Sequence, residues 1–180
     1  MEVRPTRVPG ILVLVPDVFE DSRGHFFETY HEARYRAAGI AGPFLQDNQS
    51  YSRAGVLRGL HAQRRQPQGK LVRVLEGAIF DVAVDVRPGS PTYRHWVGVP
   101  LSAENRQQMW VPPGFAHGFC VTSAGAAVAY KCTTLYDPDD EIGIAWNDPV
   151  LGITWPLATP ILSPKDAALP RLAEVAHLLA

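Results

Sequence analysis

Prolines and glycines interrupt this sequence at intervals of about ten residues from one end to the other, which limits the length of any helix. There are 16 prolines and 15 glycines in 180 residues. Both residues disfavour helix interiors, and turn-forming residues at this spacing are typical of an all-β sandwich or barrel. The length corresponds to about one domain, so we expect a single domain over residues 1–180.

The segments between these breaks are short and rich in the β-branched and aromatic residues that favour strands. The predicted strands cover residues 10–15, 25–30, 46–51, 56–61, 70–75, 78–86, 96–99, 108–111, 118–122 and 126–133. The most regular alternation is at residues 78–86, where Asp81, Ala83 and Asp85 lie opposite an apolar face. This alternation is the clearest single indication of a β fold.

Helical signals are few in this sequence. Residues 31–38 are predicted to form a short helix that ends at Gly39. A second helix is predicted from Pro170 onward, because proline suits the first turn of a helix. The apolar face of this helix consists of Leu172, Val175, Ala176 and Leu179. We expect this face to pack on the barrel.

The overall charge and hydropathy exclude several classes of function. The formal net charge is -1, so the whole molecule has no field that would favour nucleic acid or an anionic membrane. No apolar run is long enough to cross a bilayer, and residues 1–5 lack the apolar core of a signal peptide. We therefore expect a cytoplasmic protein with neither nucleic acid nor membrane as a partner.

The two cysteines, Cys120 and Cys132, both lie in apolar stretches. A disulfide between adjacent strands is one interpretation, but buried free thiols are more typical of a cytoplasmic protein. The sequence has no Cys-x-x-Cys motif, so it indicates neither a zinc site nor a redox site.

A basic stretch lies between Asp47 and Glu76. It contains no acidic residue and six basic ones, namely Arg53, Arg58, Arg64, Arg65, Lys70 and Arg73. By composition alone it is equally a solvated basic face or an anion-binding site. Arg58 and His61 are three residues apart and would face opposite sides of a regular strand. Both can reach one site only if the chain bulges or twists near Gly59.

Two histidines, His61 and His117, each lie on a strand bracketed by glycines, a pattern that resembles the two motifs of the cupin superfamily. In metal-binding cupins the first motif contributes His-x-His and a glutamate, and the second contributes one more histidine. Here Gln63 stands two residues after His61, and Lys70 lies where the carboxylate ligand would be sought. A tight catalytic metal site needs three good ligands, so we expect no metal.

The residue types that remain suit proton transfer. A histidine that titrates near neutrality is a good general base, and a tyrosine is a weak acid that can return a proton to carbon. A lysine or a second histidine can stabilise an enolate by charge and hydrogen bonding. This combination indicates proton abstraction next to a carbonyl, and inversion at such a carbon needs groups on both faces of the substrate.

Long motifs in a fixed order resemble the dTDP-4-dehydrorhamnose 3,5-epimerase family. One is Leu57-Arg58-Gly59-Leu60-His61, and the others cover residues 68–74, 80–85, 112–119, 130–133, 146–149 and 162–166. The resemblance implies a cupin jelly-roll barrel with a few short peripheral helices, a homodimer and no cofactor. It also implies epimerisation of dTDP-4-dehydro-6-deoxy-D-glucose at C3 and C5 to dTDP-4-dehydro-L-rhamnose, in dTDP-L-rhamnose biosynthesis.

The same resemblance implies roles for individual residues. His61 would be the base that removes the C3 and C5 protons, and Asp166 would orient and polarise it. Tyr130 would be the acid that reprotonates the opposite face, and Lys70 would stabilise the enolate at the C4 oxygen. Arg58 would meet the pyrophosphate or the sugar, because its fork offers paired donors to such groups.

Further positions match substrate-binding residues of the family. Arg23, Phe26 and Glu28 match nucleotide-binding positions that the partner subunit contributes, with Phe26 near the thymine. The other matching positions, which bind substrate or line the pocket, are Gln46, Asn48, His117, Tyr136, Glu141 and Lys165.

One departure from the family pattern is Ala62, where the family usually has an aromatic residue, and this change would enlarge or reshape the pocket. The alternatives are a mono-epimerase of a related dTDP-4-keto-6-deoxysugar, a metal-dependent cupin oxygenase or isomerase, and a non-catalytic sugar-nucleotide-binding cupin. Taken singly, Tyr130 could be a packing residue, Asp166 a helix N-cap and Arg23 plain surface.

Overall fold

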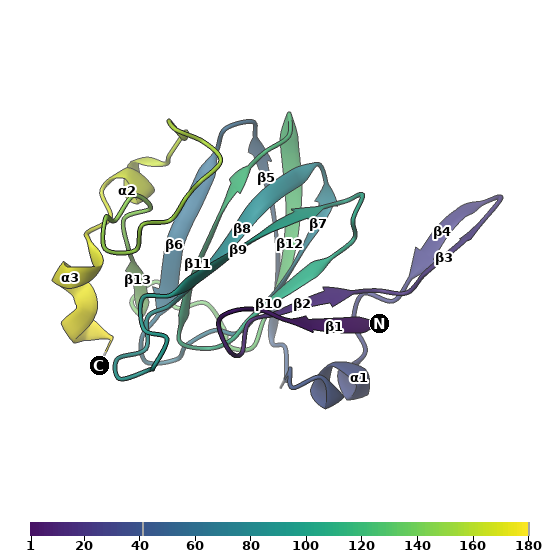
Figure 1. Cartoon of the computed structure of the whole chain (residues 1–180), viewed down its shortest axis with the longest axis horizontal. Helices are drawn as coiled ribbons and strands as arrows, with labels where there is room; N and C mark the ends of the chain where they lie inside the picture. Colours follow the sequence, from purple (N-terminus) through teal and green to yellow (C-terminus); the bar gives the residue numbers. More distant parts are fainter. Residues whose placement is uncertain (41, 180) are drawn as a thin grey trace.

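The computed structural model describes residues 1–40 and 42–179. Two antiparallel sheets face each other and form a barrel (Figure 1). The larger sheet contains, in spatial order, β1 (Glu2–Pro5), β2 (Leu12–Val15), β10 (Gln108–Val111), β7 (Lys70–Glu76), β12 (Gly125–Cys132) and β5 (Gln46–Arg53). The smaller sheet contains β13 (Glu141–Gly143), β6 (Leu57–Gln63), β11 (Phe115–Val121), β8 (Ala78–Asp85) and β9 (Trp96–Ser102).

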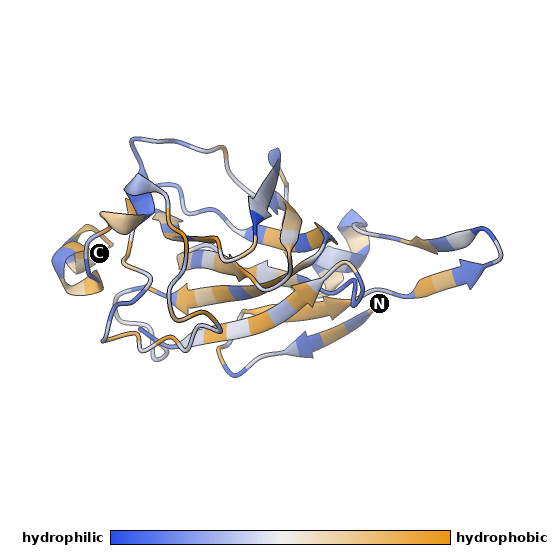
Figure 2. Cartoon of the chain, turned by 90° about the horizontal axis from the view of Figure 1, so that it is seen from above, coloured by the Kyte–Doolittle hydropathy of each residue, from blue (hydrophilic) through white to orange (hydrophobic). Residues whose placement is uncertain are grey.

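Hydrophobic side chains from both sheets fill the space between them. The main core contains Val72 and Val128 from the larger sheet and Ala83 and Phe119 from the smaller one. Figure 2 shows hydrophobic and hydrophilic residues alternating along the strands, as expected when one face of a sheet is buried. The predicted all-β fold, a cupin-type jelly-roll barrel, is confirmed.

Each predicted strand segment overlaps a strand of the structure. The prediction for residues 25–30 extended too far, because β4 (Gly24–Phe27) ends at Phe27. Three strands were not predicted, namely β1, β13 and β3 (Val18–Asp21). β1 and most of β3 are exposed and β13 has only three residues, so no apolar run marks them. Pairing with a neighbouring strand defines these three elements.

The hairpin of β3 and β4 projects away from the barrel (Figure 1). Phe19 and Phe26 are register partners on this hairpin, and their exposed fractions are 66% and 70%. Aromatic side chains normally contribute large buried areas, so the exposure of these two rings is unusual.

The alternation predicted for residues 78–86 is present, but both faces of β8 are buried. Ala83 lies in the core between the sheets, whereas Val84 packs outside the barrel in a second cluster that includes Leu172. Asp81 and Asp85 are both fully buried, at 0% exposure. The structure therefore places two carboxylates where only hydrogen bonds or ion pairs can stabilise them.

Four short helical segments lie around the barrel, namely α1 (Glu32–Ala37), α2 (Pro164–Ala167), α3 (Leu172–Val175) and the 3-10 turn η1 (Ala176–Leu178). The helix predicted for residues 31–38 is confirmed as α1. The continuous helix predicted from Pro170 was wrong: α3 starts at Leu172 and continues as the 3-10 turn after Val175. Helices this short are not stable by themselves, so contacts with the rest of the protein, such as those of the buried side chains of Tyr35, Leu172 and Val175, decide their conformation.

Cys120 and Cys132 are buried free thiols, as predicted, and do not form a disulfide. Burial raises the pKa of Cys120 to about 11, so this thiol stays protonated near neutral pH. In the described part of the chain, no helix is long and apolar enough to cross a membrane.

Candidate active site

Two adjoining cavities of about 250 and 280 Å³ lie between the sheets and share His61, Lys70 and Tyr130. The first is also lined by Gln46, Asn48, Ala62, Gln63, Gln68, Tyr136 and Glu141. The second is also lined by Ser50, Arg58, His117, Gly118, Phe119, Ser163, Lys165 and Asp166. The structure thus brings together all of the predicted catalytic residues and most of the predicted substrate-binding ones.

A bulge at Gly59 allows Arg58 and His61 to reach the same cavity. On β11, His117 is the register partner of His61 and Phe119 is that of Arg58, so the pairing shifts by one residue between them. Gly59 has a φ of +112°, and a Cβ atom there would lie 2.7 Å from the Cα of Gly118. Only glycine fits this close approach, and the predicted bulge is confirmed.

His61 is held by a carboxylate from the C-terminal segment. Its Nε2 lies 2.7 Å from Oδ1 of Asp166. Asp166 is not the N-cap of α2, which was the alternative interpretation: Ser163 caps that helix and accepts from the Asp166 N–H at 3.0 Å. In the neutral tautomer in which Nε2 donates to Asp166, Nδ1 carries the lone pair and is the basic atom of the ring.

The surroundings of Asp166 keep it ionised. Burial alone would raise its pKa, but the hydrogen bond and charge of His61 oppose this, as do hydrogen bonds from Ser163 and the Gly59 backbone. The net effect is that the pKa of Asp166 lies below its ordinary value. An ionised carboxylate both orients the imidazole and stabilises the imidazolium that would form when the ring accepts a proton.

Tyr130 and Lys70 reach the cavities from the larger sheet, opposite the strand of His61. Burial raises the pKa of the Tyr130 phenol, and nearby Cys132 and Glu141 raise it further. Burial lowers the pKa of the Lys70 ammonium, although neighbouring negative groups oppose the shift. A phenol and an amine on one wall therefore face an oriented histidine on the other.

Glu141 connects the polar groups at the edge of the first cavity. Its Oε2 accepts from the Tyr136 hydroxyl at 2.6 Å and from Lys165 Nζ at 2.5 Å. Its Oε1 lies 3.9 Å from Nδ1 of His61. Burial alone would raise the pKa of Glu141, but the hydrogen bonds from Lys165 and Tyr136 outweigh it, so its pKa is lowered. On the same edge, Gln46 accepts from the Tyr136 N–H at 2.7 Å.

A second histidine–carboxylate pair lies in the wall of the second cavity. Nε2 of His117 is 2.8 Å from Oδ1 of Asp81. Sequence reasoning placed His117 at the pocket but gave Asp81 no role. The sequence feature that could have identified Asp81 is its place on the same strand face as the core residue Ala83. An unpaired carboxylate would not be stable there, so a partner for it was to be expected.

Other cavity residues were not predicted as site residues, namely Ser50, Gln63, Gln68, Gly118, Phe119 and Ser163. Gln63 was considered only as a missing metal ligand. Its amide nitrogen donates to the backbone carbonyls of Gln66 and Leu135, so the side chain is part of the protein framework. Among the described residues, no group of three or more His, Cys, Asp or Glu side chains could hold a metal ion.

Arg23, Phe26 and Glu28 do not reach the cavities of their own chain. Arg23 pairs with Asp21 on the exposed hairpin, and Glu28 pairs with Arg34 at 3.0 Å. Their assignment to a partner's substrate site therefore stays a prediction.

The jelly-roll barrel defines a class of protein, the cupins, and the acid–base groups inside it are the candidate catalytic residues. Residues 5–174 match the family profile described as dTDP-4-dehydrorhamnose 3,5-epimerase, and the chain belongs to this family. It is 53% identical over 169 residues to a dTDP-4-dehydrorhamnose 3,5-epimerase from Neisseria gonorrhoeae. That match covers 93% of this chain and 52% of the relative, so the chain spans about half the length of that protein.

Solved structures are similar over nearly the whole chain. One is dTDP-6-deoxy-D-glucose-3,5-epimerase from Legionella pneumophila Philadelphia 1 in complex with dTDP-4-keto-L-rhamnose, with 51% identity and a TM-score of 0.96, covering 99% of this chain and 96% of that chain. Another is a 3'-monoepimerase from Streptomyces bikiniensis in complex with dTDP-quinovose, with 35% identity and a TM-score of 0.91, covering 97% and 90% of the two chains.

Proposed function

We propose that this chain converts dTDP-4-dehydro-6-deoxy-D-glucose to dTDP-4-dehydro-L-rhamnose by epimerisation at C3 and C5, within dTDP-L-rhamnose biosynthesis. The observation that carries this proposal is the His61–Asp166 pair on one wall of the cavity, opposite Tyr130 and Lys70 on the other. Both C3 and C5 are adjacent to the C4 carbonyl, so the same groups suit both inversions.

The proposed reaction is two rounds of proton transfer. Nδ1 of His61 accepts the proton from the carbon, and the electron pair of the broken C–H bond moves toward the C4 oxygen to form an enolate. Lys70 stabilises the negative charge on that oxygen. Tyr130 then donates its proton to the opposite face of the same carbon. His61 has gained one proton and Tyr130 has lost one, and exchange with water restores both before the second round.

The nucleotide end of the substrate is proposed to meet Arg58 and Lys165. Arg58 donates from Nε to Ser52 Oγ at 2.9 Å and from one terminal nitrogen to the Tyr51 carbonyl at 3.3 Å. These bonds fix the guanidinium at the edge of the second cavity, where a diphosphate could accept from its remaining hydrogens. We further propose a cytoplasmic homodimer in which the exposed hairpin, with Phe26, reaches the partner's nucleotide.

A mono-epimerase is the second candidate, and Ala62 is the observation that favours it. Ala62 lines the first cavity, so a small residue at this position changes the shape of the wall beside His61. The similarity to a 3'-monoepimerase with a TM-score of 0.91 means that barrel shape does not separate the two activities.

The proposal is tested by incubating the protein with dTDP-4-dehydro-6-deoxy-D-glucose in deuterated water that contains a chelator. Proton NMR then follows deuterium entry at each carbon. Entry at both C3 and C5, with L-rhamnose-configured product in a coupled reductase assay, is the expected result. Entry at C3 alone or C5 alone would indicate the mono-epimerase, and no entry in a protein that binds dTDP would leave only a sugar-nucleotide-binding role.

A further inference from the structure

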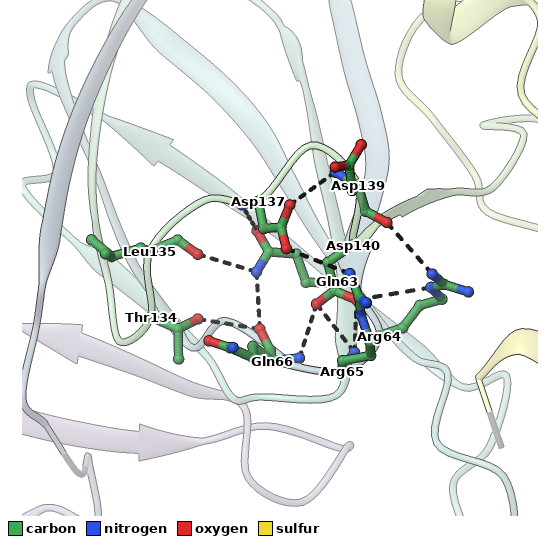
Figure 3. A network of polar contacts seen from close by, with 9 residues as sticks. All are labelled: Gln63, Arg64, Arg65, Gln66, Thr134, Leu135, Asp137, Asp139 and Asp140. Atoms are coloured by element: carbon green, nitrogen blue, oxygen red, sulfur yellow. Dashed lines mark hydrogen bonds and ion pairs between the residues drawn. The ribbon is translucent and has the colours of Figure 1, made fainter.

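A polar network beside the first cavity joins the loop after β6 to the loop between β12 and β13 (Figure 3). Two side chains, Gln63 and Asp140, make most of its contacts, and we name this pair the clasp. Neither lies among the reacting groups described above, and neither is at the surface: their exposed fractions are 5% and 1%. Buried polar groups of this kind stabilise one arrangement of the chain when all their bonds are made.

The Gln63 amide holds the residues on both sides of Tyr136. Its Nε2 donates to the carbonyl oxygen of Leu135 at 3.2 Å, and its Oε1 accepts from the N–H of Asp137 at 3.1 Å. Its Nε2 also donates to the carbonyl of Gln66 at 3.0 Å. The backbone on either side of Tyr136 is therefore fixed to a strand of the barrel.

These bonds explain why a glutamine suits position 63. The site uses two N–H donors and one carbonyl acceptor at the same time. A glutamine amide has both kinds of group, whereas a neutral imidazole has one donor and one acceptor, and a carboxylate has acceptors only. Gln63 stands at a position where metal-binding cupins carry a metal ligand. In this protein its side chain holds a loop instead.

Asp140 anchors the other end of the same loop, next to Glu141. Its carboxylate accepts from the N–H of Arg65 at 2.9 Å, from the N–H of Gln66 at 2.9 Å and from Arg65 Nε at 3.0 Å. The basic loop at residues 64–66 is thereby bound to the residue directly before β13. Charge-assisted bonds to a buried carboxylate are stronger than neutral ones.

The two residues that the clasp holds, Tyr136 and Glu141, both line the first cavity and bond to each other at 2.6 Å. Residues 133–140 contain no strand, so no ladder of backbone hydrogen bonds fixes their position. Tyr136 is 49% exposed and gains little orientation from packing. The restraints on Tyr136 are therefore the clasp bonds to its two neighbours, the bond from its N–H to Gln46 and the bond from its hydroxyl to Glu141, whereas Glu141 is also held by the pairing of β13 with β6.

We infer that Gln63 and Asp140 are positioning residues that hold Tyr136 and Glu141 as a wall of the substrate pocket. The inference rests on the proposed function, because it assumes that a dTDP-sugar occupies this cavity. Neither residue acts on the reacting carbon, so their loss should weaken binding and leave the chemical steps nearly intact.

The test compares two clasp variants with a matched control. Gln63→Met keeps the length of the side chain and removes all three bonds, and Asp140→Asn keeps its shape and removes its charge. Asp85→Asn is the control, because Asp85 is also fully buried and accepts from Arg87, Ser90 and Thr92, but lines neither cavity. Measurements are kcat, KM, Tm and the Kd for dTDP-glucose, which has no keto group and cannot enolise.

We expect each clasp variant to raise both KM and the Kd for dTDP-glucose by about tenfold, with kcat within about threefold of the wild type. The control should lower Tm and leave both binding constants unchanged. The inference is overturned if the clasp variants lower Tm as the control does and keep KM and Kd within about twofold of the wild type. Because dTDP-glucose binding is measured separately, a wild type that binds it without epimerising its keto analogue would refute the proposed function and still test the clasp.

Discussion

The chain holds two histidine–carboxylate pairs of nearly equal length on neighbouring strands. His61 meets Asp166 at 2.7 Å, and His117 meets Asp81 at 2.8 Å. The two histidines are register partners on β6 and β11. Yet the side chain of His61 is 28% exposed, whereas that of His117 is 7% exposed. The same pair of groups therefore occurs once facing the open cavity and once within the barrel wall.

The origin of each carboxylate explains this difference. Asp81 lies on β8, which is directly beside β11, so the pairing of two strands is enough to form its contact with His117. Asp166 belongs to α2, 105 residues after His61, and approaches the histidine from outside the sheet. A ring that is held from one side by a later segment can keep its other nitrogen accessible to a substrate. We infer that access, and not the hydrogen bond itself, decides which of the two histidines can act as the base.

The largest expected effect is a loss of activity that distinguishes His61 from His117. We expect His61→Asn to lower kcat by roughly 1,000-fold, because it removes the proposed general base. Tm should change little, since the side chain is partly exposed to the cavity. A coupled reductase assay measures the rate, and His117→Asn on the neighbouring strand is the matched control. Equal losses of kcat in the two variants would remove the distinction between the pairs.

A smaller loss of activity is expected when Tyr130, on the opposite wall of the cavity, is changed. Tyr130→Phe should lower product formation by roughly 100-fold, because the proposed acid is missing. Proton removal by His61 does not need the tyrosine hydroxyl, so deuterium should still enter the recovered substrate with its original configuration. Proton NMR in deuterated water measures both outcomes. Loss of exchange together with turnover would show that Tyr130 is needed for the first proton transfer as well.

We expect the His117–Asp81 pair to contribute more to stability than the His61–Asp166 pair, which is the reverse of their order in activity. His117→Ala should lower the free energy of unfolding by about 3 kcal/mol, because it leaves the carboxylate of Asp81 buried and unpaired. Oδ2 of Asp81 already has no hydrogen-bond partner among the residues that the structure describes. His61→Ala should cost about 1 kcal/mol, since the Asp166 carboxylate keeps its hydrogen bonds from the Ser163 side chain and the Gly59 backbone.

Urea unfolding followed by tryptophan fluorescence measures both free energies. A His61→Ala variant as unstable as His117→Ala would mean that the active-site pair is also a major structural contact.

The smallest expected effect is a dependence of the unfolding free energy on pH. The folded-state pKa of Asp166 lies below its ordinary value. A depressed carboxylate pKa contributes stability that is fully present above the unfolded value of about 4 and is lost as the pH falls through the folded value. The difference in unfolding free energy between the wild type and Asp166→Asn should therefore shrink when the pH is lowered from 7 to about 3. A difference that stays constant over this range would contradict the lowered pKa.

Much of the barrel was predictable because its signals are local. Short apolar segments between turn residues indicated the strands, and the alternation at residues 78–86 gave β8 within one residue at its end. The C-terminal helix was wrong in its extent, because an amphipathic pattern shows which face is buried and not where the helix begins or changes to a 3-10 turn. The exposed β3 and the three-residue β13 had no apolar signal of their own.

Part of the candidate site was likewise predictable from the sequence, and part was not. His61, Lys70 and Tyr130 were identified through motifs that resemble a family, and the structure places them together. The clasp was not predicted, because Gln63 and Asp140 bind mainly backbone groups, and any residue can present a backbone N–H or carbonyl. A sequence has no pattern that marks such contacts before the loops have met.

By itself, the sequence determined most of the strands and the types of acid and base available, and it marked Gly59 as the place where a bulge would be needed. This bulge depends on one residue, because only glycine combines a φ of +112° with an approach of 2.7 Å to the facing strand. Only the tertiary structure decided which carboxylate meets which histidine. Those partners are 105 and 36 residues apart, so their contacts depend on strand register and on the docking of α2, which no local preference specifies.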